Sequence, residues 1–171
     1  MTHTEYSHNP VLLTECIEAL NIKPSGLYID GTFGRGGHSQ AILDCLSEQG
    51  RLIAFDKDPA AIVTAQNRFA NDPRFNIVHC SFARLQETLK AENKCGAVDG
   101  ILLDLGVSSP QLDDPERGFS FQQSGLLDMR MNPHEGSSAE QWINSAKETD
   151  IASVLYEYGE ERYSRRIARE I

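Results

Sequence analysis

Hydrophobic residues along the chain gather in short unbroken runs, each of which ends at a polar or glycine-containing turn. Runs of this length predict strands that are buried on both faces of a parallel sheet. The four predicted strands are residues 27–29, 51–55, 75–78 and 98–103.

Between these runs the hydrophobic residues recur at three- and four-residue spacing, which predicts helices. The predicted helices cover 11–20, a segment that starts near His38, a segment after Asp58, and 85–91. Pro10 suits the start of the first helix, and Asp58-Pro59 suits the cap and first turn of the third. Alternating strands and helices predict an α/β fold with right-handed crossovers.

The pattern changes after Leu105. Residues 106–115 are rich in glycine, serine, proline and aspartate, so we expect no regular structure there or in the following 117–121. Helices then resume. Ser138 opens one through a capping box, Asp150 caps another that ends at Gly159, and a last helix starts near Glu160.

The strand at 98–103 would leave one edge of the predicted sheet uncovered, since no later segment has a strand pattern. We therefore expect the chain to be the front part of a longer protein whose remaining portion completes the sheet.

A glycine-rich turn, DGTFGRGGHS at 30–39, lies between the first strand and its helix. This order lets a nucleotide-like cofactor approach bare backbone at the carboxyl ends of the strands. Asp56 ends the next strand, at a spacing that suits a carboxylate bound to ribose hydroxyls. The pattern predicts a site for an adenosine-type cofactor.

The identity of that cofactor depends on the charges near the turn. Ser39 replaces the third glycine of a dinucleotide fingerprint, and Asp30 would repel a pyrophosphate. The same carboxylate suits S-adenosylmethionine, which carries an ammonium and a cationic sulfur. A nicotinamide cofactor stays open as the alternative, and Asp30 could instead cap the turn that follows it.

Composition narrows the class of protein. The chain has 171 residues, 40% of them hydrophobic and 24% charged, as in a soluble globular domain. Its net charge is -9, so any nucleic-acid contact must come from a local patch. The four cysteines lack paired spacing, and His3, His79 and His134 lack ligand spacing, so we expect no disulfide and no metal. Without a secretion signal or a membrane-spanning run, we expect a cytoplasmic protein.

Six sequence motifs, spread along the chain, closely resemble those of one family, the bacterial 16S rRNA (cytosine-N(4)) methyltransferases of the RsmH/MraW type. The similarity extends over essentially all 171 residues. Its motifs are HNPVLL at 8–13, DGTFGRGGHS at 30–39, DKDP at 56–59, DLGVSSPQLD at 104–113, RGFSF at 117–121 and LDMRM at 127–131.

The resemblance carried by these motifs implies methylation of the exocyclic amine of cytidine 1402 of 16S rRNA, in the small ribosomal subunit, with S-adenosylmethionine as donor. It implies an incomplete Rossmann-like methyltransferase sheet in 1–105, followed in 106–171 by a loop and the start of a helical substrate-binding insert. The cofactor contacts it implies are Gly36, Gly37, His38, Asp56, Phe82, Asp104 and Gln111. Whether the protein is a monomer or a homodimer stays open.

Asp104 is the candidate catalytic residue, because an acceptor for the amine proton is needed where the fourth strand ends. A pure cofactor contact is the alternative. The segment Asp104 to Val107 lacks the prolines and the aromatic residue that often accompany such an acid, so the base must be held differently. The rival functions are a nicotinamide-dependent oxidoreductase and a cofactor-binding fragment without catalysis.

Other candidates have equally simple structural alternatives. Phe82 could stack on adenine or fill the core, Gln111 could bind the cofactor or form a turn, and His38 could act through its backbone N–H. In the loop, Phe119 and Phe121 could stack on a flipped cytosine with Arg117 as a phosphate anchor, or plug the insert onto the sheet. Arg162, Arg166 and Arg169 could form an RNA-binding helix face or a solvated surface.

Overall fold

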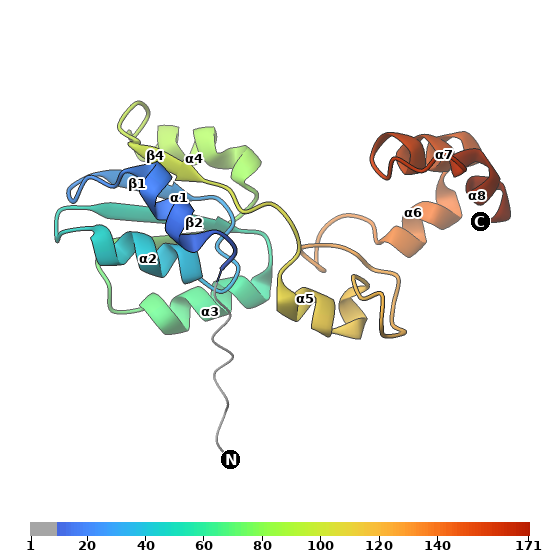
Figure 1. Ribbon diagram of the computed structural model, residues 1–171, viewed down its shortest axis with the longest axis horizontal. Coiled ribbons are helices and arrows are strands. Elements are labelled where there is room, and N and C mark those ends of the chain that lie inside the picture. The colour runs from blue at the N-terminus through green and yellow to red at the C-terminus, as the bar shows by residue number, and fades with distance from the viewer. Residues whose placement is uncertain (1–9) are drawn as a thin grey trace, which may run out of the picture. The chain divides into compact units, whose positions relative to one another are not determined.

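The computed structural model describes residues 10–171 and divides into two compact units, Met1–Gly106 and Val107–Ile171. Figure 1 shows the sheet with its helices in the first unit and short helices joined by long loops in the second. His8 and Asn9 of the HNPVLL motif lie outside the described residues.

The first unit is built on a four-stranded parallel sheet, as the hydrophobic pattern predicts. The strands lie in the order β3-β2-β1-β4. Their bounds are β1 Leu27–Asp30, β2 Arg51–Asp56, β3 Phe75–His79 and β4 Gly100–Leu102. The chain therefore moves outward from β1 to β3 and then returns to pair β4 with the other side of β1. This reversal creates a topological switch point between β1 and β4.

Helices cover both faces of the sheet (Figure 1). They are α1 Leu13–Leu20, α2 Gly37–Cys45, α3 Pro59–Phe69 and α4 Leu85–Ala91. Side chains that alternate along a strand serve opposite faces: Tyr28 packs with α2 and α3, whereas Ile29 packs with α4. Both are almost completely buried, which explains why these strands read as unbroken apolar runs.

Three aromatic rings anchor α3 to the sheet. The centroid of Phe33 lies 5.9 Å from that of Phe69 and 5.8 Å from that of Phe75, and the latter two are 4.6 Å apart. Such offset and edge-on pairs contribute about 0.5–1.5 kcal/mol each beyond the burial of their surface. Phe33 belongs to the glycine-rich turn, so this cluster also fixes the turn to the core.

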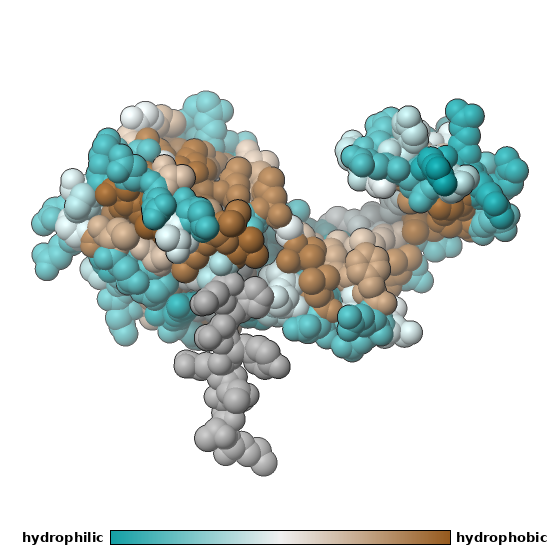
Figure 2. Space-filling model, viewed as in Figure 1, coloured by the Kyte–Doolittle hydropathy of each residue, from teal (hydrophilic) through white to brown (hydrophobic). Residues whose placement is uncertain are grey.

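The fourth strand differs from the sequence expectation. It is three residues long, and Ile101 and Leu103 are 49% and 47% exposed, so the prediction of burial on both faces is wrong here. The reason is its position: within residues 10–171, β4 pairs with β1 alone and lies at the edge of the sheet. Figure 2 shows hydrophobic surface on the side of the first unit where β4 runs.

The second unit contains α5 Ser109–Asp113, α6 Ala139–Ser145, α7 Glu148–Glu157 and α8 Ser164–Glu170. The prediction that 106–115 holds no regular structure is wrong, because α5 lies inside it. Ser108 and Gln111 form a capping box there, and Pro110 occupies the first turn, where it needs no N–H partner. The capping box predicted at Ser138 is confirmed.

Three predicted helix starts are wrong by two to four residues. Helix α1 begins at Leu13, because Leu12 has a left-handed φ of 54°, and Pro10 lies beside Gly37 instead. Helix α7 begins at Glu148, with extended Lys147 as its N-cap and Asp150 inside its first turn. The start of α8 is delayed to Ser164 because Glu160 has a φ of 51°.

Helix α7 packs against α8 through a small buried patch. Ile151 of α7 is buried, as are Ser164 and Ala168 of α8. The small side chains of Ser164 and Ala168 allow the two helices to approach closely. Among residues 10–171 we find no helix that is both long and apolar enough to cross a bilayer.

Candidate functional site

The candidate site lies at the carboxyl ends of β1, β2 and β4, beside the switch point of the sheet. Asp30 ends β1, Asp56 ends β2, and Asp104 follows β4 by two residues. In open α/β sheets this edge is where ligands bind, because the strand connections diverge there and leave a crevice.

The glycine-rich turn is joined to both strands that flank β1. The Gly31 N–H donates to Leu102 O at 2.9 Å on the β4 side, and the Phe33 N–H donates to Phe55 O at 3.0 Å on the β2 side. Gly36 has a φ of 76°, and a Cβ placed on it would lie 2.6 Å from the Phe33 ring. A glycine is therefore required at this position, both for its backbone conformation and for space.

Asp56 is connected to the turn by its carboxylate. One oxygen accepts the Gly34 N–H at 2.8 Å, and the other accepts the Asp58 N–H at 2.8 Å. Asp58 in turn caps α3 by accepting the Ala60 N–H at 2.9 Å, as the sequence predicts. Each carboxylate oxygen has two acceptor positions, so Asp56 keeps lone pairs for ribose hydroxyls while it holds the turn.

Asp30 faces the protein interior. It is completely buried, accepts the Thr32 N–H at 3.1 Å and accepts the Ser39 hydroxyl at 2.7 Å. Burial raises the pKa of Asp30, and the two hydrogen bonds and nearby His38 oppose that rise. The alternative in which Asp30 caps the turn is therefore correct. The hypothesis that its carboxylate faces a cationic ligand directly is wrong, because no part of it reaches the surface.

His38 and Asp104 come together on the other side of the turn. Nδ1 of His38 lies 3.9 Å from Oδ2 of Asp104. The His38 side chain is 7% exposed and that of Asp104 is 54% exposed, so the pair joins a buried imidazole to an accessible carboxylate. Nε2 of His38 is buried and has no hydrogen-bond partner within residues 10–171.

Phe82 follows β3 in a 3₁₀ turn, Phe82–Arg84. Its side chain is 39% exposed, which contradicts the alternative that it fills the core. A Cβ placed on Gly31 would lie 3.3 Å from the Phe82 Cβ, so this aromatic residue stands next to the glycine-rich turn. Its contact with adenine stays a prediction.

Two residues that sequence reasoning did not assign to the site hold it in shape. The Thr32 hydroxyl oxygen accepts the Asp104 N–H at 2.7 Å, which ties the turn to the segment after β4. Ser39, noted in the sequence only as a missing glycine, is fully buried against Asp30. The signal for both is the pattern Asp-Gly-Thr with a serine nine residues after the aspartate, which pairs a buried carboxylate with nearby donors.

Gln111 lies in the second unit. Its side-chain oxygen accepts the Ser108 N–H at 2.9 Å as part of the α5 capping box, and the residue is 7% exposed. Gln111 is therefore buried because its side chain caps α5. The cofactor contact that the resemblance implies for Gln111 stays a prediction.

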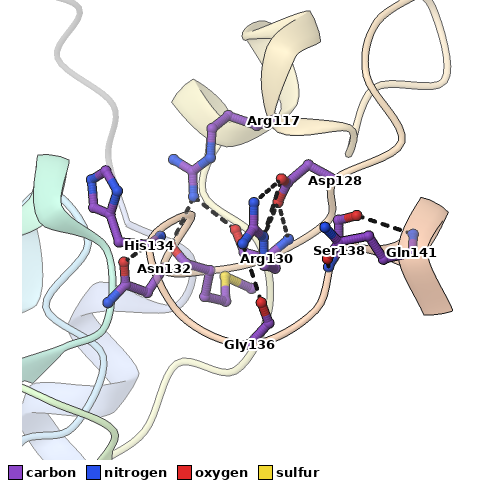
Figure 3. Close-up of polar contacts among 9 residues, drawn as sticks. Arg117, Asp128, Arg130, Asn132, His134, Gly136, Ser138 and Gln141 are labelled. Atoms are coloured by element: carbon purple, nitrogen blue, oxygen red, sulfur yellow. Dashed lines mark hydrogen bonds and ion pairs between the residues drawn. The ribbon is translucent and has the colours of Figure 1, made fainter.

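The second unit also contains a loop fixed by arginines (Figure 3). Nη2 of Arg117 donates to the carbonyls of Arg130 and Met131 at 3.1 and 2.8 Å. Arg130 forms a two-pronged ion pair with Asp128, and this guanidinium holds the pKa of Asp128 below its usual range. Arg117 therefore braces the loop, and the sequence hypothesis of a phosphate anchor does not account for these bonds.

The aromatic and basic candidates of the second unit differ in exposure. Phe119 is half-buried, whereas Phe121 is fully exposed. Arg162 precedes α8 and stacks on Tyr163, with 4.7 Å from its guanidinium carbon to the ring centroid. It therefore does not share a helical face with Arg166 and Arg169, and the predicted patch is smaller than the sequence suggested.

No group of three or more metal-ligating side chains occurs within the described part of the chain, residues 10–171. The charged groups of the site are instead the carboxylates of Asp56 and Asp104, with His38 beside the latter. Such a site suits an organic ligand that carries hydroxyls and positive charge.

Together, a parallel sheet with a switch point, a glycine-rich turn and an acid at the end of β2 define a Rossmann-like, nucleoside-cofactor-binding domain of the methyltransferase class. The sequence matches the MraW methylase family over residues 5–171, and the chain belongs to that family. MraW methylases use S-adenosylmethionine. Both the family and the cofactor predicted from the motifs are thereby confirmed.

A comparison with curated proteins gives a similar relative. The chain is 59% identical over 167 residues to the ribosomal RNA small subunit methyltransferase H of Alteromonas mediterranea. The match covers 98% of this chain and 53% of that protein, so the chain spans about half the length of the curated relative.

Proposed function

We propose that this chain forms the cofactor-binding part of an S-adenosylmethionine-dependent methyltransferase that acts on N(4) of a cytidine in 16S rRNA of the small ribosomal subunit. The name of the Alteromonas relative supports ribosomal RNA as substrate, and the six motifs support the cytidine amine. The proposal takes the cytoplasm as the place of action and requires no second copy of the chain.

The observation that carries the proposal is the Asp56 carboxylate bound to the Gly34 N–H at the carboxyl ends of β1 and β2. This bond places a ribose acceptor beside the backbone of the glycine-rich turn. The required glycine at 36 and the exposed carboxylate of Asp104 fit a ligand with polar and cationic groups.

When bound, S-adenosylmethionine would supply a methyl group, activated by its cationic sulfur, for transfer to the amine nitrogen of cytosine. Asp104 accepts the proton that the amine sheds as the new N–C bond forms, since its carboxylate is accessible and its backbone is fixed by Thr32. Asp56 and the turn hold the adenosine end, and orientation of this kind can supply about 7–11 kcal/mol of the barrier reduction.

Calorimetry with S-adenosylhomocysteine and with NAD tests the cofactor. We expect the chain to bind S-adenosylhomocysteine, and we expect Asp56→Asn to weaken binding about tenfold or more, because charge-assisted hydrogen bonds contribute about 1.5–3 kcal/mol. Asp99→Asn is the matched control. Asp99 accepts the Leu27 N–H at the opposite end of β1, so this variant should keep full affinity.

Two results would contradict the proposal. Binding of NAD in place of S-adenosylhomocysteine would favour the nicotinamide-dependent alternative. Equal loss in Asp56→Asn and Asp99→Asn would show a general effect on folding, which circular dichroism of both variants would detect.

The methylation itself needs a separate test, because the chain spans about half of its relative. Mass spectrometry of 16S rRNA from cells that express only this chain, and lack their own enzyme, would detect N(4)-methylcytidine. Restored methylation would exclude the alternative of a cofactor-binding fragment without catalysis. Its absence, together with binding of S-adenosylhomocysteine, would support that alternative.

A further inference from the structure

Within the glycine-rich turn, the buried imidazole of His38 is the polar group that the proposed reaction leaves unexplained. A buried polar atom without a partner is rare in folded proteins and usually has a functional reason. Nε2 of His38 has no partner within residues 10–171, and Nδ1 lies 3.9 Å from Oδ2 of Asp104. That separation is longer than the ~2.7–3.2 Å of a hydrogen bond.

The tautomer of His38 follows from these two environments. A hydrogen on Nε2 would be a buried N–H without an acceptor, which is unfavourable. A hydrogen on Nδ1 points instead toward a carboxylate, and Nε2 then stays an unprotonated nitrogen. The hydrogen bond that one ring nitrogen makes generally decides which nitrogen carries the proton.

We propose that His38 is a positioning residue for Asp104: its Nδ1–H donates to Oδ2 of Asp104 and leaves Oδ1 to face the reacting amine. This inference rests on the proposed methyltransferase function of the site. His38 touches neither the methyl group nor the amine, and acts through the carboxylate alone. A small rotation of the accessible Asp104 side chain closes the distance to Nδ1, while Thr32 keeps the Asp104 backbone in place.

The surroundings of His38 favour this arrangement. Its ring lies near two carboxylates, exposed Asp104 and buried Asp30, so a donor N–H that faces an acid is stabilised. Asp30 is already satisfied by Thr32 and Ser39. Asp104 is thus the carboxylate that still needs a donor from this side of the turn.

The role differs from the backbone contact that the resemblance implies for His38. A backbone N–H survives any substitution except proline, whereas the proposed donor is the imidazole. The variant His38→Gln therefore separates the two roles, because it keeps the backbone and removes Nδ1.

Nitrogen NMR of the histidine rings tests the tautomer in the full chain, without need of activity. The chain has five histidines, and His38→Gln assigns the His38 signals by their loss. We expect protonated Nδ1 and unprotonated Nε2 in the wild type, and a shift toward the Nε2–H form in Asp104→Asn. A dominant Nε2–H form in the wild type, or unchanged His38 signals in Asp104→Asn, would overturn the proposal.

A double-mutant cycle of S-adenosylhomocysteine binding tests whether His38 acts through Asp104. We expect His38→Gln to weaken binding about 2- to 10-fold in the wild type, as for loss of one hydrogen bond, and to have no further effect in Asp104→Asn. His79→Gln is the matched control, because His79 is exposed and contacts the Lys57 carbonyl at 3.0 Å.

The two proposals fail in different ways. Equal weakening by His38→Gln in both backgrounds would overturn the positioning role and leave the cofactor assignment intact. If the wild type binds no S-adenosylhomocysteine, the proposed function fails, and the NMR result still decides the His38–Asp104 interaction.

Discussion

Asp30 and Asp56 end neighbouring strands, and their environments give them different tasks. Asp30 is completely buried and is satisfied by groups of its own turn and helix. Asp56 holds the turn from outside and keeps acceptor positions for a ligand. The same side chain therefore serves as an internal brace at one strand end and as a binding group at the next, and burial decides between them.

Burial of Asp30 has a consequence for stability. Its pKa is raised by burial above the value near 3.8 of the unfolded chain. The folded state then binds the proton more tightly, so the associated stability is present below that value and is lost as the pH rises through the folded pKa. Asp30→Asn removes the ionisation and can keep both hydrogen bonds, since the Asn oxygen accepts from Thr32 and its amide donates to Ser39.

We expect the free energy of unfolding of Asp30→Asn, relative to the wild type, to increase as the pH rises from 4 toward 7. Urea unfolding at three pH values measures it. Asp128→Asn is the comparison of opposite sign: Arg130 lowers the pKa of Asp128, so the stabilisation is present above the unfolded value of 3.8 and is lost as the pH falls below it, where a further unfolding measurement detects it. A relative stability of Asp30→Asn that does not change with pH would contradict the expected coupling.

At the scale of elements, short helices of the second unit depend on their caps. Helix α6 has seven residues, too few to form on propensity alone. Ser138 accepts the Gln141 N–H at 3.2 Å, and the Gln141 side chain accepts the Ser138 N–H at 3.1 Å. These two bonds satisfy donors that the first turn would otherwise leave unpaired.

Ser138→Ala should therefore destabilise the second unit by about 1 kcal/mol. Trp142 is the single tryptophan of the chain and lies within α6, so its fluorescence reports on this unit during urea unfolding. Ser137→Ala changes the residue before the cap and should leave the transition unchanged. Equal shifts in the two variants would show that the capping bonds contribute nothing specific.

The elements that sequence could predict are those with a periodic pattern. Strands β1, β2 and β3 and helices α2 and α3 carry unbroken or helix-spaced apolar runs, and all were predicted. Helix α5 was missed because its five residues are set by Ser108, Pro110 and Gln111, and have no periodicity to detect. The late start of α8 follows the left-handed φ of Glu160, which no periodic pattern in the sequence predicts.

The site shows the same division. The sequence predicts that the glycine-rich turn lies near Asp56 and Asp104, because parallel strands bring their carboxyl ends to one edge of the sheet. The inward orientation of Asp30 was not predictable, since it follows from contacts with Thr32 and Ser39. The sequence also did not predict the His38–Asp104 interaction, because the two residues are 66 positions apart.

At the scale of the molecule, the chain divides into two compact units, each of which has its own set of internal contacts. The sheet and the cofactor turn belong to the first, and helices α6, α7 and α8 belong to the second. We therefore expect ligand binding at the sheet edge to leave hydrogen exchange in helices α6, α7 and α8 unchanged.

Hydrogen exchange with mass spectrometry can measure this separation. We expect S-adenosylhomocysteine to protect amides in 31–38 and 56–58, because these segments surround the Asp56 carboxylate. Peptides from 139–170 should exchange at the same rate with and without ligand. Strong protection of 139–170 would show that the ligand couples the two units.

The hydrogen bonds that join the glycine-rich turn to β2 and β4 also affect the rate at which a ligand can associate. Ordering a free backbone costs about 1–2 kcal/mol per residue, and here Leu102, Phe55 and Asp56 already hold Gly31, Phe33 and Gly34 in the folded protein. A ligand therefore binds to a turn that is already ordered, and binding does not require the loop to rearrange. We therefore expect association to be a single fast step, with a rate set by diffusion and by the orientation of the ligand.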